Sequence, residues 1–158
     1  MLLFNTVLVA QGMSQNATEE AAVTGVINRL FKGMELGDSA MVHSVFYKEI
    51  TMARVTRDKN NNVVLRSEKS VDGFLKAIGT PHKEVWYEDI WNIKVQIDGD
   101  FAQLWCDFAF YRDKTFSHCG VDAFHLIKAN GEWKIFHLAD TNRKTGCDIP
   151  QNIRDRHK

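Results

Sequence analysis

The sequence has no excess of either charge and no apolar run long enough to cross a membrane. Its 20 Lys and Arg residues balance 20 Asp and Glu residues, so the formal net charge is zero. A neutral chain gives no electrostatic reason to expect binding to nucleic acid or to an anionic membrane surface. The apolar run from residue 2 to residue 10 is far shorter than the roughly 20 residues that span a bilayer. We therefore expect neither nucleic acid nor a membrane as a partner.

Recognisable catalytic and metal-binding motifs are also missing. The sequence contains no glycine-rich phosphate loop, no nucleophile elbow and no zincin motif. Its three cysteines form no CxxC or Cys/His spacing that would indicate zinc. We expect Cys106 and Cys119 to be diagonal neighbours on one sheet face, too far apart for a disulfide, with Cys147 alone near the end. These observations predict buried apolar thiols, no metal site and no bound cofactor.

The length and composition predict a single domain. A chain of 158 residues with 44% hydrophobic residues can bury one substantial core. We expect the domain to span residues 16–145, followed by a C-terminal tail at 146–158 whose basic ending, residues 154–158, is solvated. Residues 1–15 either resemble the remnant of a secretory signal peptide, without its basic start, or form an ordered N-terminal arm. The first alternative favours an exported bacterial protein, periplasmic or secreted, and the second is compatible with a cytoplasmic one.

Three helices are predicted in the first half of the chain. A capping box at residues 16–19 and apolar residues at helical spacing indicate a first helix from about residue 18 to residue 36, ended by Gly37. Asp38 can cap a short second helix, and Ser70 can cap a third helix that stops at Gly79. A hairpin between residues 50 and 66 separates the second and third helices.

The region from Phe101 to Arg143 predicts three long strands joined by tight turns. The pair at residues 130–131, Asn-Gly, favours a two-residue hairpin turn, and the pair at residues 113–114, Asp-Lys, suggests another. Counting outward from these turns places Asp122 opposite Ala139 and Phe124 opposite His137. It also places Trp105 opposite Asp122 and Ala109 opposite His118. A fourth long strand at 84–97 precedes a turn whose length leaves two registers open.

Alternation of side chains assigns these residues to two faces of the sheet. One face mixes aromatic and polar side chains, as a pocket wall does. Its candidate site residues are Trp105, Asp107, Tyr111, His118, Asp122, Phe124 and His137. The other face is almost wholly apolar, which predicts a homodimer that packs through it. The residues of this expected interface are Leu104, Cys106, Phe108, Phe110, Val121, Ile127 and Phe136.

Asp122 and His137 are the candidate catalytic pair. The predicted register places them on one face at a diagonal Cα distance of roughly 7 to 8 Å, which two side chains can close to a hydrogen bond. An ionised Asp122 would raise the pKa of His137, and the histidine would orient the carboxylate for acid–base work. The structural alternative is that the two groups only satisfy each other in a crowded sheet. Trp105, Asp107, Tyr111, His118 and Phe124 are the candidate ligand-binding residues, whereas we assign Trp133 to the core against the first helix.

Several segments together carry a resemblance to a known family. They are SVDGFLKAI, WNIKVQIDGDFAQLWCDFAFY, FSHCGVDAFHLIKANGEWKIFHLADTNRK and the approach from Phe46 to Val55. In their order, with a long helix first, they resemble the nuclear-transport-factor-2-like superfamily over about residues 18–143, and within it the polyketide-cyclase-like and putative lumazine-binding proteins. The resemblance implies an α+β, cystatin-like, cone-like fold, in which three N-terminal helices pack in a strongly curved antiparallel sheet around a pocket. It also implies a homodimer formed through the sheets.

The resemblance leaves the function open, because family members include isomerases, epoxide hydrolases, cyclases, scaffolds and proteins of unknown activity. The first hypothesis is a domain that binds a small apolar or aromatic molecule in the pocket. The second is a cofactor-free lyase, isomerase or hydrolase that uses an Asp/His pair. The third is a dimerisation scaffold.

Overall fold

The computed structural model describes residues 5–158, with side-chain surroundings described from residue 17 onward. Four helices and six strands occur in this range. In chain order they are α1 (Asn5–Leu36), α2 (Ser39–Ser44), β1 (Phe46–Arg57), β2 (Val63–Glu68), α3 (Asp72–Gly79), β3 (Trp86–Asp98), β4 (Phe101–Arg112), β5 (Thr115–Ala129), β6 (Glu132–Thr141) and α4 (Gln151–Arg156).

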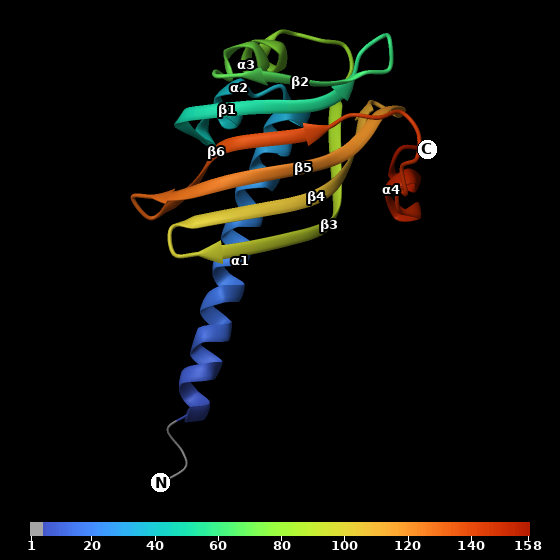
Figure 1. Cartoon of the computed structure of the whole chain (residues 1–158). Coiled ribbons are helices and arrows are strands. Elements are labelled where there is room, and N and C mark those ends of the chain that lie inside the picture. Colours follow the sequence, from blue (N-terminus) through green and yellow to red (C-terminus); the bar gives the residue numbers. More distant parts are fainter. Residues whose placement is uncertain (1–4) are drawn as a thin grey trace.

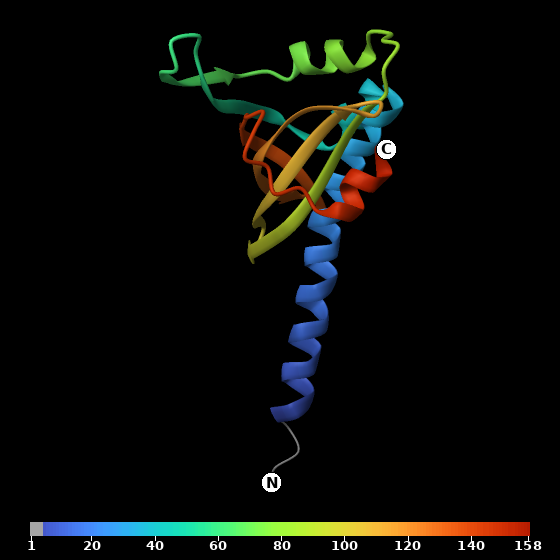
Figure 2. The same cartoon turned by 90° about the vertical axis from the view of Figure 1, so that its right-hand side faces the viewer.

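The first helix begins earlier than predicted, at Asn5 rather than near residue 18. Residues 5–17 contain no proline, so the polar residues of the expected capping box do not interrupt the helix. The first turns of α1 project beyond the sheet (Figures 1 and 2). None of the helices in residues 5–158 combines the length and the apolar character of a membrane span. At its other end α1 stops as predicted, with Gly37 at a φ of 64° and Asp38 capping α2 through Met41 N at 2.9 Å.

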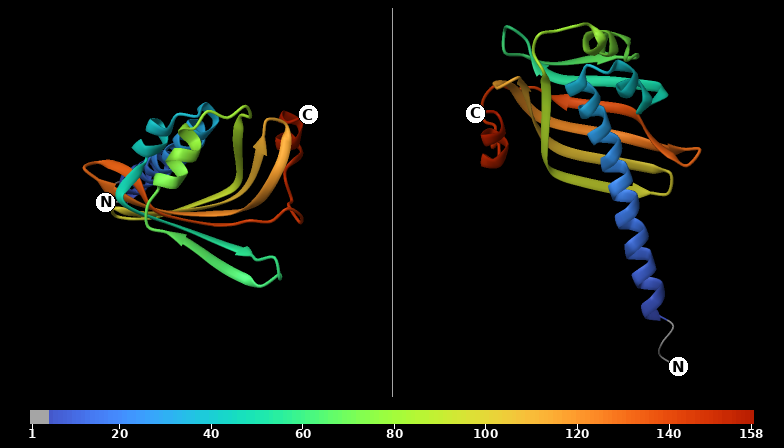
Figure 3. Two further views of the ribbon diagram at one scale, coloured as in Figure 1. Left: turned by 90° about the horizontal axis from the view of Figure 1, so that it is seen from above. Right: turned by 180° about the vertical axis from the view of Figure 1, so that it is seen from behind.

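The six strands form one mixed sheet in the order β2-β1-β6-β5-β4-β3 (Figure 1). Every neighbouring pair is antiparallel except β1 and β6, which run parallel, so the expectation of a wholly antiparallel sheet is wrong. The reason is that β1 and β6 are joined by a long connection that contains β2, α3 and the strands β3 to β5, and such a connection permits parallel pairing. Helix α1 lies across one side of the sheet, seen most directly in the right panel of Figure 3. We also expected a strongly curved sheet, and the structure does not show strong curvature.

The tight turns were predicted correctly, and so was the register next to them. Asn130 and Gly131 have positive φ values of 53° and 82°, as a type I′ turn requires. Trp133 therefore pairs with Lys128, as predicted. Asp113 has a φ of 51°, and beside this turn Tyr111 pairs with residue 116 as predicted.

Two β-bulges shift the register farther from the turns. In the β5–β6 pair an irregularity between His125 and Leu126 leaves His137 opposite His125 and Asp140 opposite Asp122. In the β4–β5 pair an irregularity between Phe110 and Tyr111 leaves His118 opposite Phe110 and Asp122 opposite Cys106. The four predicted pairs Phe124–His137, Asp122–Ala139, Ala109–His118 and Trp105–Asp122 are therefore wrong. A bulge inserts one unpaired residue, and a shift of one residue moves every later side chain to the other face.

The shift reverses the predicted roles of the two faces in β4. We call the side that packs on α1 the helix-facing side and its opposite the outer side. The core lies on the helix-facing side and includes Leu104, Cys106, Phe108 and Phe110, each at most 8% exposed. These four residues were predicted to form the dimer interface together with Val121, Ile127 and Phe136, which lie on the outer side. That predicted interface is wrong as a single surface, whereas the homodimer itself stays a prediction.

The C-terminal segment, residues 146–158, is docked on the sheet, whereas we expected its basic ending at 154–158 to be solvated. Ile149 and Ile153 pack on Ala109 and Tyr111, on the outer side near one end of the strands. His157 stacks on the Tyr111 ring with centroids 3.8 Å apart. Its Nε2 is also 2.5 Å from a carboxylate oxygen of Asp89.

A disulfide between Cys119 and Cys147 fastens this segment, so the expectation that Cys119 is a free thiol is wrong. The bulge in β5 turns Cys119 to the outer side, away from Cys106, and its Cα lies 6.2 Å from that of Cys147. Cys106 is free and buried, as predicted. Trp133 is also in the core, where its indole Nε1 donates to Glu19 at 2.8 Å.

Candidate functional site

A row of polar side chains crosses the helix-facing side of the sheet. Arg54 on β1 is in register with Asp140 on β6, which is opposite Asp122 on β5. Asp122 is in turn opposite Cys106 on β4. Four adjacent strands thus bring together four residues that are widely separated in the sequence. We call this set the cross-strand row.

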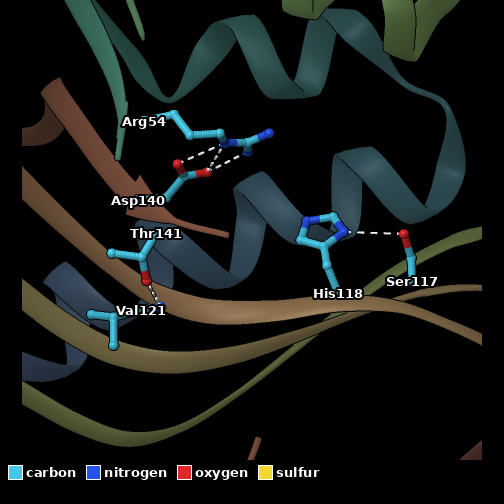
Figure 4. A network of polar contacts seen from close by, with 6 residues as sticks. All are labelled: Arg54, Ser117, His118, Val121, Asp140 and Thr141. Atoms are coloured by element: carbon cyan, nitrogen blue, oxygen red, sulfur yellow. Dashed lines mark hydrogen bonds and ion pairs between the residues drawn. The ribbon is translucent and has the colours of Figure 1, made fainter. Parts of the chain in front are cut away.

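Arg54 and Asp140 form the charged end of the row (Figure 4). The Arg54 Nε donates to both carboxylate oxygens of Asp140, at 2.7 and 2.9 Å, and a terminal guanidinium nitrogen forms a further short contact. This fork-to-fork geometry is the strong form of an ion pair. The hydrogen bonds that Arg54 donates to Asp140 raise the pKa of Arg54, which therefore stays charged.

Asp122 is the one buried charged or polar residue in the described core, at 3% exposure. Burial raises its pKa well above the ordinary value, and the nearby carboxylates of Glu88 and Asp140 raise it further. Its Oδ2 is buried without a hydrogen-bond partner in the described residues. Asp122 is therefore protonated at neutral pH, as a carboxyl group that can donate a hydrogen bond.

Glu88 on β3 is the electrostatic neighbour of Asp122. Burial, followed by repulsion from Asp140, raises the pKa of Glu88 to about 8. Asp122 and Glu88 interact through their carboxyl groups, with Asp122 as the group that retains its proton. At pH 7 the set of Arg54, Asp140, Asp122 and Glu88 holds one compensated ion pair and two neutral acids.

Two further groups on this side are uncharged at neutral pH. Burial raises the pKa of the Cys106 thiol, which excludes it as a thiolate nucleophile at neutral pH. Burial and the positive charge of Arg54 lower the pKa of His118 to about 4, so its imidazole is neutral. The His118 ring lies beside the rings of Phe108 and Phe110, with centroids 5.6 and 5.1 Å away. Its Nδ1 is 3.0 Å from the Ser117 hydroxyl (Figure 4).

The structure divides the predicted site residues between the two sides. Three of the seven, namely His118, Asp122 and Phe124, lie on the helix-facing side. Four lie on the outer side: Trp105, Asp107, Tyr111 and His137. The pairing of Asp122 with His137 is therefore wrong, because the bulge in β6 places Asp140 opposite Asp122 and turns His137 to the outer side, opposite His125.

The four outer residues have other surroundings. Trp105 is 50% exposed. The carboxylate of Asp107 accepts a hydrogen bond from Asn92 at 2.7 Å, beside the irregularity in the β3–β4 pair. Tyr111 is covered by the C-terminal segment, and His137 bonds to Thr51.

Arg54, Glu88 and Asp140 were not predicted as site residues. Glu88 lies in the strand whose register the sequence left open. Arg54 and Asp140 meet only because β1 pairs in parallel with β6, and local sequence carries no signal for such a pairing. An arginine inside an alternating strand, and an aspartate at the end of another, were the available clues.

Two cavities flank the cross-strand row. The first, of about 470 Å³, lies between α3 and strands β1, β2 and β6, and we call it the α3 pocket. Its lining residues are Met52, Ala53, Arg54, Arg66, Glu68, Gly73, Phe74, Leu138 and Asp140. The second, of about 800 Å³, is a groove along the edge strand β3, between α1 and the C-terminal segment. Glu88 lines this edge groove, whereas Arg54 and Asp140 line the α3 pocket. The set of Arg54, Asp140, Asp122 and Glu88 therefore borders one cavity at each end.

The order of the strands and helices agrees with a sequence match to one protein family. The family model described as "Putative lumazine-binding" matches residues 18–138. The chain belongs to this family. No curated protein matches the sequence.

Solved structures share the fold of this member of the putative lumazine-binding family. One is a nuclear-transport-factor-2-like protein of unknown function from Shewanella baltica, with 17% identity, a TM-score of 0.60, and coverage of 82% of this chain and 97% of that chain. A putative scytalone dehydratase from Novosphingobium aromaticivorans has 13% identity and a TM-score of 0.68, over 88% and 93% of the two chains. Another protein from that organism, described as having a cystatin-like fold, has 14% identity and a TM-score of 0.66, over 99% and 98%. At these identities the similarity establishes the cystatin-like, α+β fold and no activity.

Proposed function

We propose that the protein binds a small organic acid with an apolar body in the α3 pocket. The observation that carries the proposal is a pair of arginines, Arg54 and Arg66, in direct register on β1 and β2 at the wall of this pocket. Like charges directly opposite each other on neighbouring strands destabilise a sheet unless an anion compensates them. Asp140 compensates Arg54, which leaves Arg66 to receive the acidic group of a ligand.

The rest of the pocket suits the body of such a ligand. Met52, Phe74 and Leu138 supply apolar surface, and the volume of about 470 Å³ falls in the usual range for small-molecule sites. Glu68 also lines the pocket, but it forms no ion pair with Arg66 within the described residues. The edge groove is larger, yet its walls are mostly charged, which fits an apolar ligand less well.

Binding can be tested with 1-naphthoate and its neutral analogue 1-naphthalenemethanol as probes, using calorimetry and the shift in melting temperature. We expect the acid to bind and the alcohol to bind at least tenfold more weakly, because Arg66 recognises the charge. Arg66→Gln should remove the preference for the acid. Lys69→Gln, a change of an exposed neighbouring cation, should leave it unchanged.

A plugging variant distinguishes the α3 pocket from other sites. Gly73 lines the pocket, and a side chain there would first meet only the Glu68 carboxylate, at 3.9 Å. Gly73→Leu should therefore fill the pocket and abolish binding while the fold is kept. Gly25→Leu, at an exposed helix position with open space, is the matched control. Binding of 1-naphthoate that survives both Gly73→Leu and Arg66→Gln would contradict the proposal.

A second candidate function is acid–base catalysis without a cofactor. The neutral carboxyl of Asp122 can donate a proton and the neutral imidazole of His118 can accept one, which is the combination that loss of water from a hydroxy-ketone requires. The two residues are four positions apart on β5, roughly 13 Å along the strand, so they would have to act on one substrate from two places. Two of the similar structures are described as putative dehydratases.

Mass spectrometry after incubation with β-hydroxy-ketones tests this function. Turnover that is lost in Asp122→Asn and in His118→Gln would support it.

We also propose that the protein works in an oxidising compartment outside the cytoplasm. The Cys119–Cys147 disulfide supports this location, because such bonds persist mainly in exported proteins. Alkylation of thiols in cells before lysis, followed by mass spectrometry, measures the oxidation state directly. A protein recovered from the cytoplasm with both cysteines alkylated would contradict the proposed location.

A further inference from the structure

We propose that His125 and His137 form a two-histidine site for a divalent transition-metal ion on the outer side of the sheet. The site is separate from the α3 pocket, because the two histidines lie on the opposite side from Arg54 and Asp140. The β-bulge that removes His137 from the neighbourhood of Asp122 is also what places it opposite His125.

The geometry of the two rings suits chelation. Their centroids are 5.5 Å apart, with the ring planes inclined by 37°. Two imidazoles on one tetrahedral zinc ion, with metal–nitrogen distances near 2 Å, have centroids about 5 Å apart. The direct pairing of the two residues on β5 and β6 keeps their rings neighbours on the outer side of the sheet.

Thr51 on β1 fixes the orientation of His137. Its hydroxyl lies 2.7 Å from Nδ1 of His137, and the two residues are in register on neighbouring strands. An Nδ1–H that donates to the hydroxyl selects the tautomer with a free lone pair on Nε2. Metal-binding histidines commonly have their second nitrogen held in this way. The hydroxyl of Thr51 is thus a positioning group for the proposed ligand.

His125 contributes a neutral ring in an aromatic surrounding. The rings of Phe101 and Phe136 lie 5.6 and 6.0 Å from it, between centroids. Burial, and then the neighbouring His137, lower the pKa of His125 and so favour its neutral form. Metal coordination requires that form of histidine.

The chemistry of the site limits which ions it binds. No group of three or more potential metal ligands exists among the residues that the structure describes, so water completes the coordination. Two imidazoles favour copper, nickel and zinc over magnesium and calcium, which prefer oxygen ligands. We expect copper(II) to bind most tightly, followed by nickel and zinc.

The test uses the intact, metal-free protein titrated with copper(II), nickel(II), zinc(II) and magnesium. We expect one copper ion per chain by calorimetry, nitrogen coupling in the copper electron paramagnetic resonance spectrum, and no binding of magnesium. His125→Gln and His137→Gln should each weaken copper binding at least tenfold. His43→Gln, which removes an exposed histidine on α2, should leave it unchanged.

A second variant keeps the test informative if a histidine substitution disturbs the fold. Thr51→Val keeps the shape of the side chain and both histidines, and it should weaken copper binding roughly tenfold, as the loss of an orienting hydrogen bond does. A stoichiometry of one copper ion per two chains would also support the site if copper binding is lost in the same variants. In that case a second copy of the chain supplies the remaining ligands. Copper binding that is unchanged in both histidine variants, or an equal loss in His43→Gln, would overturn the proposal.

Discussion

Asp122 and Asp140 lie directly opposite each other on β5 and β6, on the side of the sheet that faces α1. Two carboxylates in this position would repel each other. The structure relieves the repulsion in two ways, since Arg54 pairs with Asp140 and burial keeps Asp122 protonated. The two aspartates therefore have different chemical roles although they are neighbours.

The two aspartates should respond differently to the same substitution. Asp122→Asn replaces a neutral acid by a neutral amide of similar shape, and we expect the free energy of unfolding at pH 7 to change by less than about 1 kcal/mol. Asp140→Asn leaves Arg54 without its anionic partner and should cost about 1 to 2 kcal/mol, since Arg54 remains partly solvated. Urea unfolding of both variants measures the difference. A larger loss in Asp122→Asn would show that Asp122 is ionised.

Stability should decrease as the pH rises from 6.5 to 8. The native pKa of Glu88 is raised from 4.5 to about 8, so in this window the folded state still holds a proton that the unfolded state has already released. The contribution of Glu88 to the free energy of unfolding is complete below pH 4.5 and is lost as the pH rises through about 8. Asp122 has a raised pKa and adds to the same slope. Urea unfolding in pH steps should show the decrease, and Glu88→Gln should remove roughly half of it.

His118 has the opposite dependence, which separates the two effects. Its native pKa is lowered from 6.5 to about 4, so its stabilisation is present above pH 6.5 and is lost as the pH falls through about 4. His118→Gln should therefore change the slope between pH 4 and 6.5 and leave the slope above 6.5 unchanged. A change above pH 6.5 in this variant would contradict the assigned pKa shifts.

Trp133 should be a major contributor to stability. It is 5% exposed and joins α1 to β6 through its bond to Glu19, which also pairs with Lys128 at 2.7 Å. Trp133→Ala should cost about 3 to 5 kcal/mol, the usual range for truncating a buried aromatic residue. Trp133→Phe keeps most of the ring and removes the hydrogen bond, so its cost should be about 1 to 2 kcal/mol. Thermal unfolding of the two variants gives both numbers, and equal losses would show that packing of the ring contributes little.

The disulfide should stabilise the protein without being needed for docking of α4. It closes a segment with a sequence separation of 28, for which the chain-entropy estimate is roughly 3 to 4 kcal/mol. Cys147→Ser should lower the free energy of unfolding by up to this amount. Hydrogen exchange should still protect the amides of Ile153 and Arg154, because Ile153 stays packed on the sheet. Loss of that protection would show that the bond, rather than the packing, holds the segment.

The sequence by itself determined the elements that depend on neighbouring residues. Asn130 and Gly131 specify a hairpin because both must adopt positive φ, and the pairs next to this turn follow from counting. Gly37 and Asp38 mark where α1 ends and α2 begins for equally local reasons. The family resemblance rests on the order of such elements, which is why the fold could be recognised before the site.

Only the tertiary structure decided which side chains share a face. The bulges near residues 117 and 136 each add one residue to a strand, and each reverses the alternation beyond it. His137 therefore lies on the other side of the sheet from Asp122, and Asp140 rather than Ala139 is opposite Asp122. No turn residue announces these bulges, which lie inside β5 and β6 and away from the hairpin turns. Arg54 reached the site through parallel pairing of β1 with β6, a contact between strands 86 residues apart at this pair. Local sequence sets φ and ψ preferences over a few residues, whereas register far from a turn depends on the whole core.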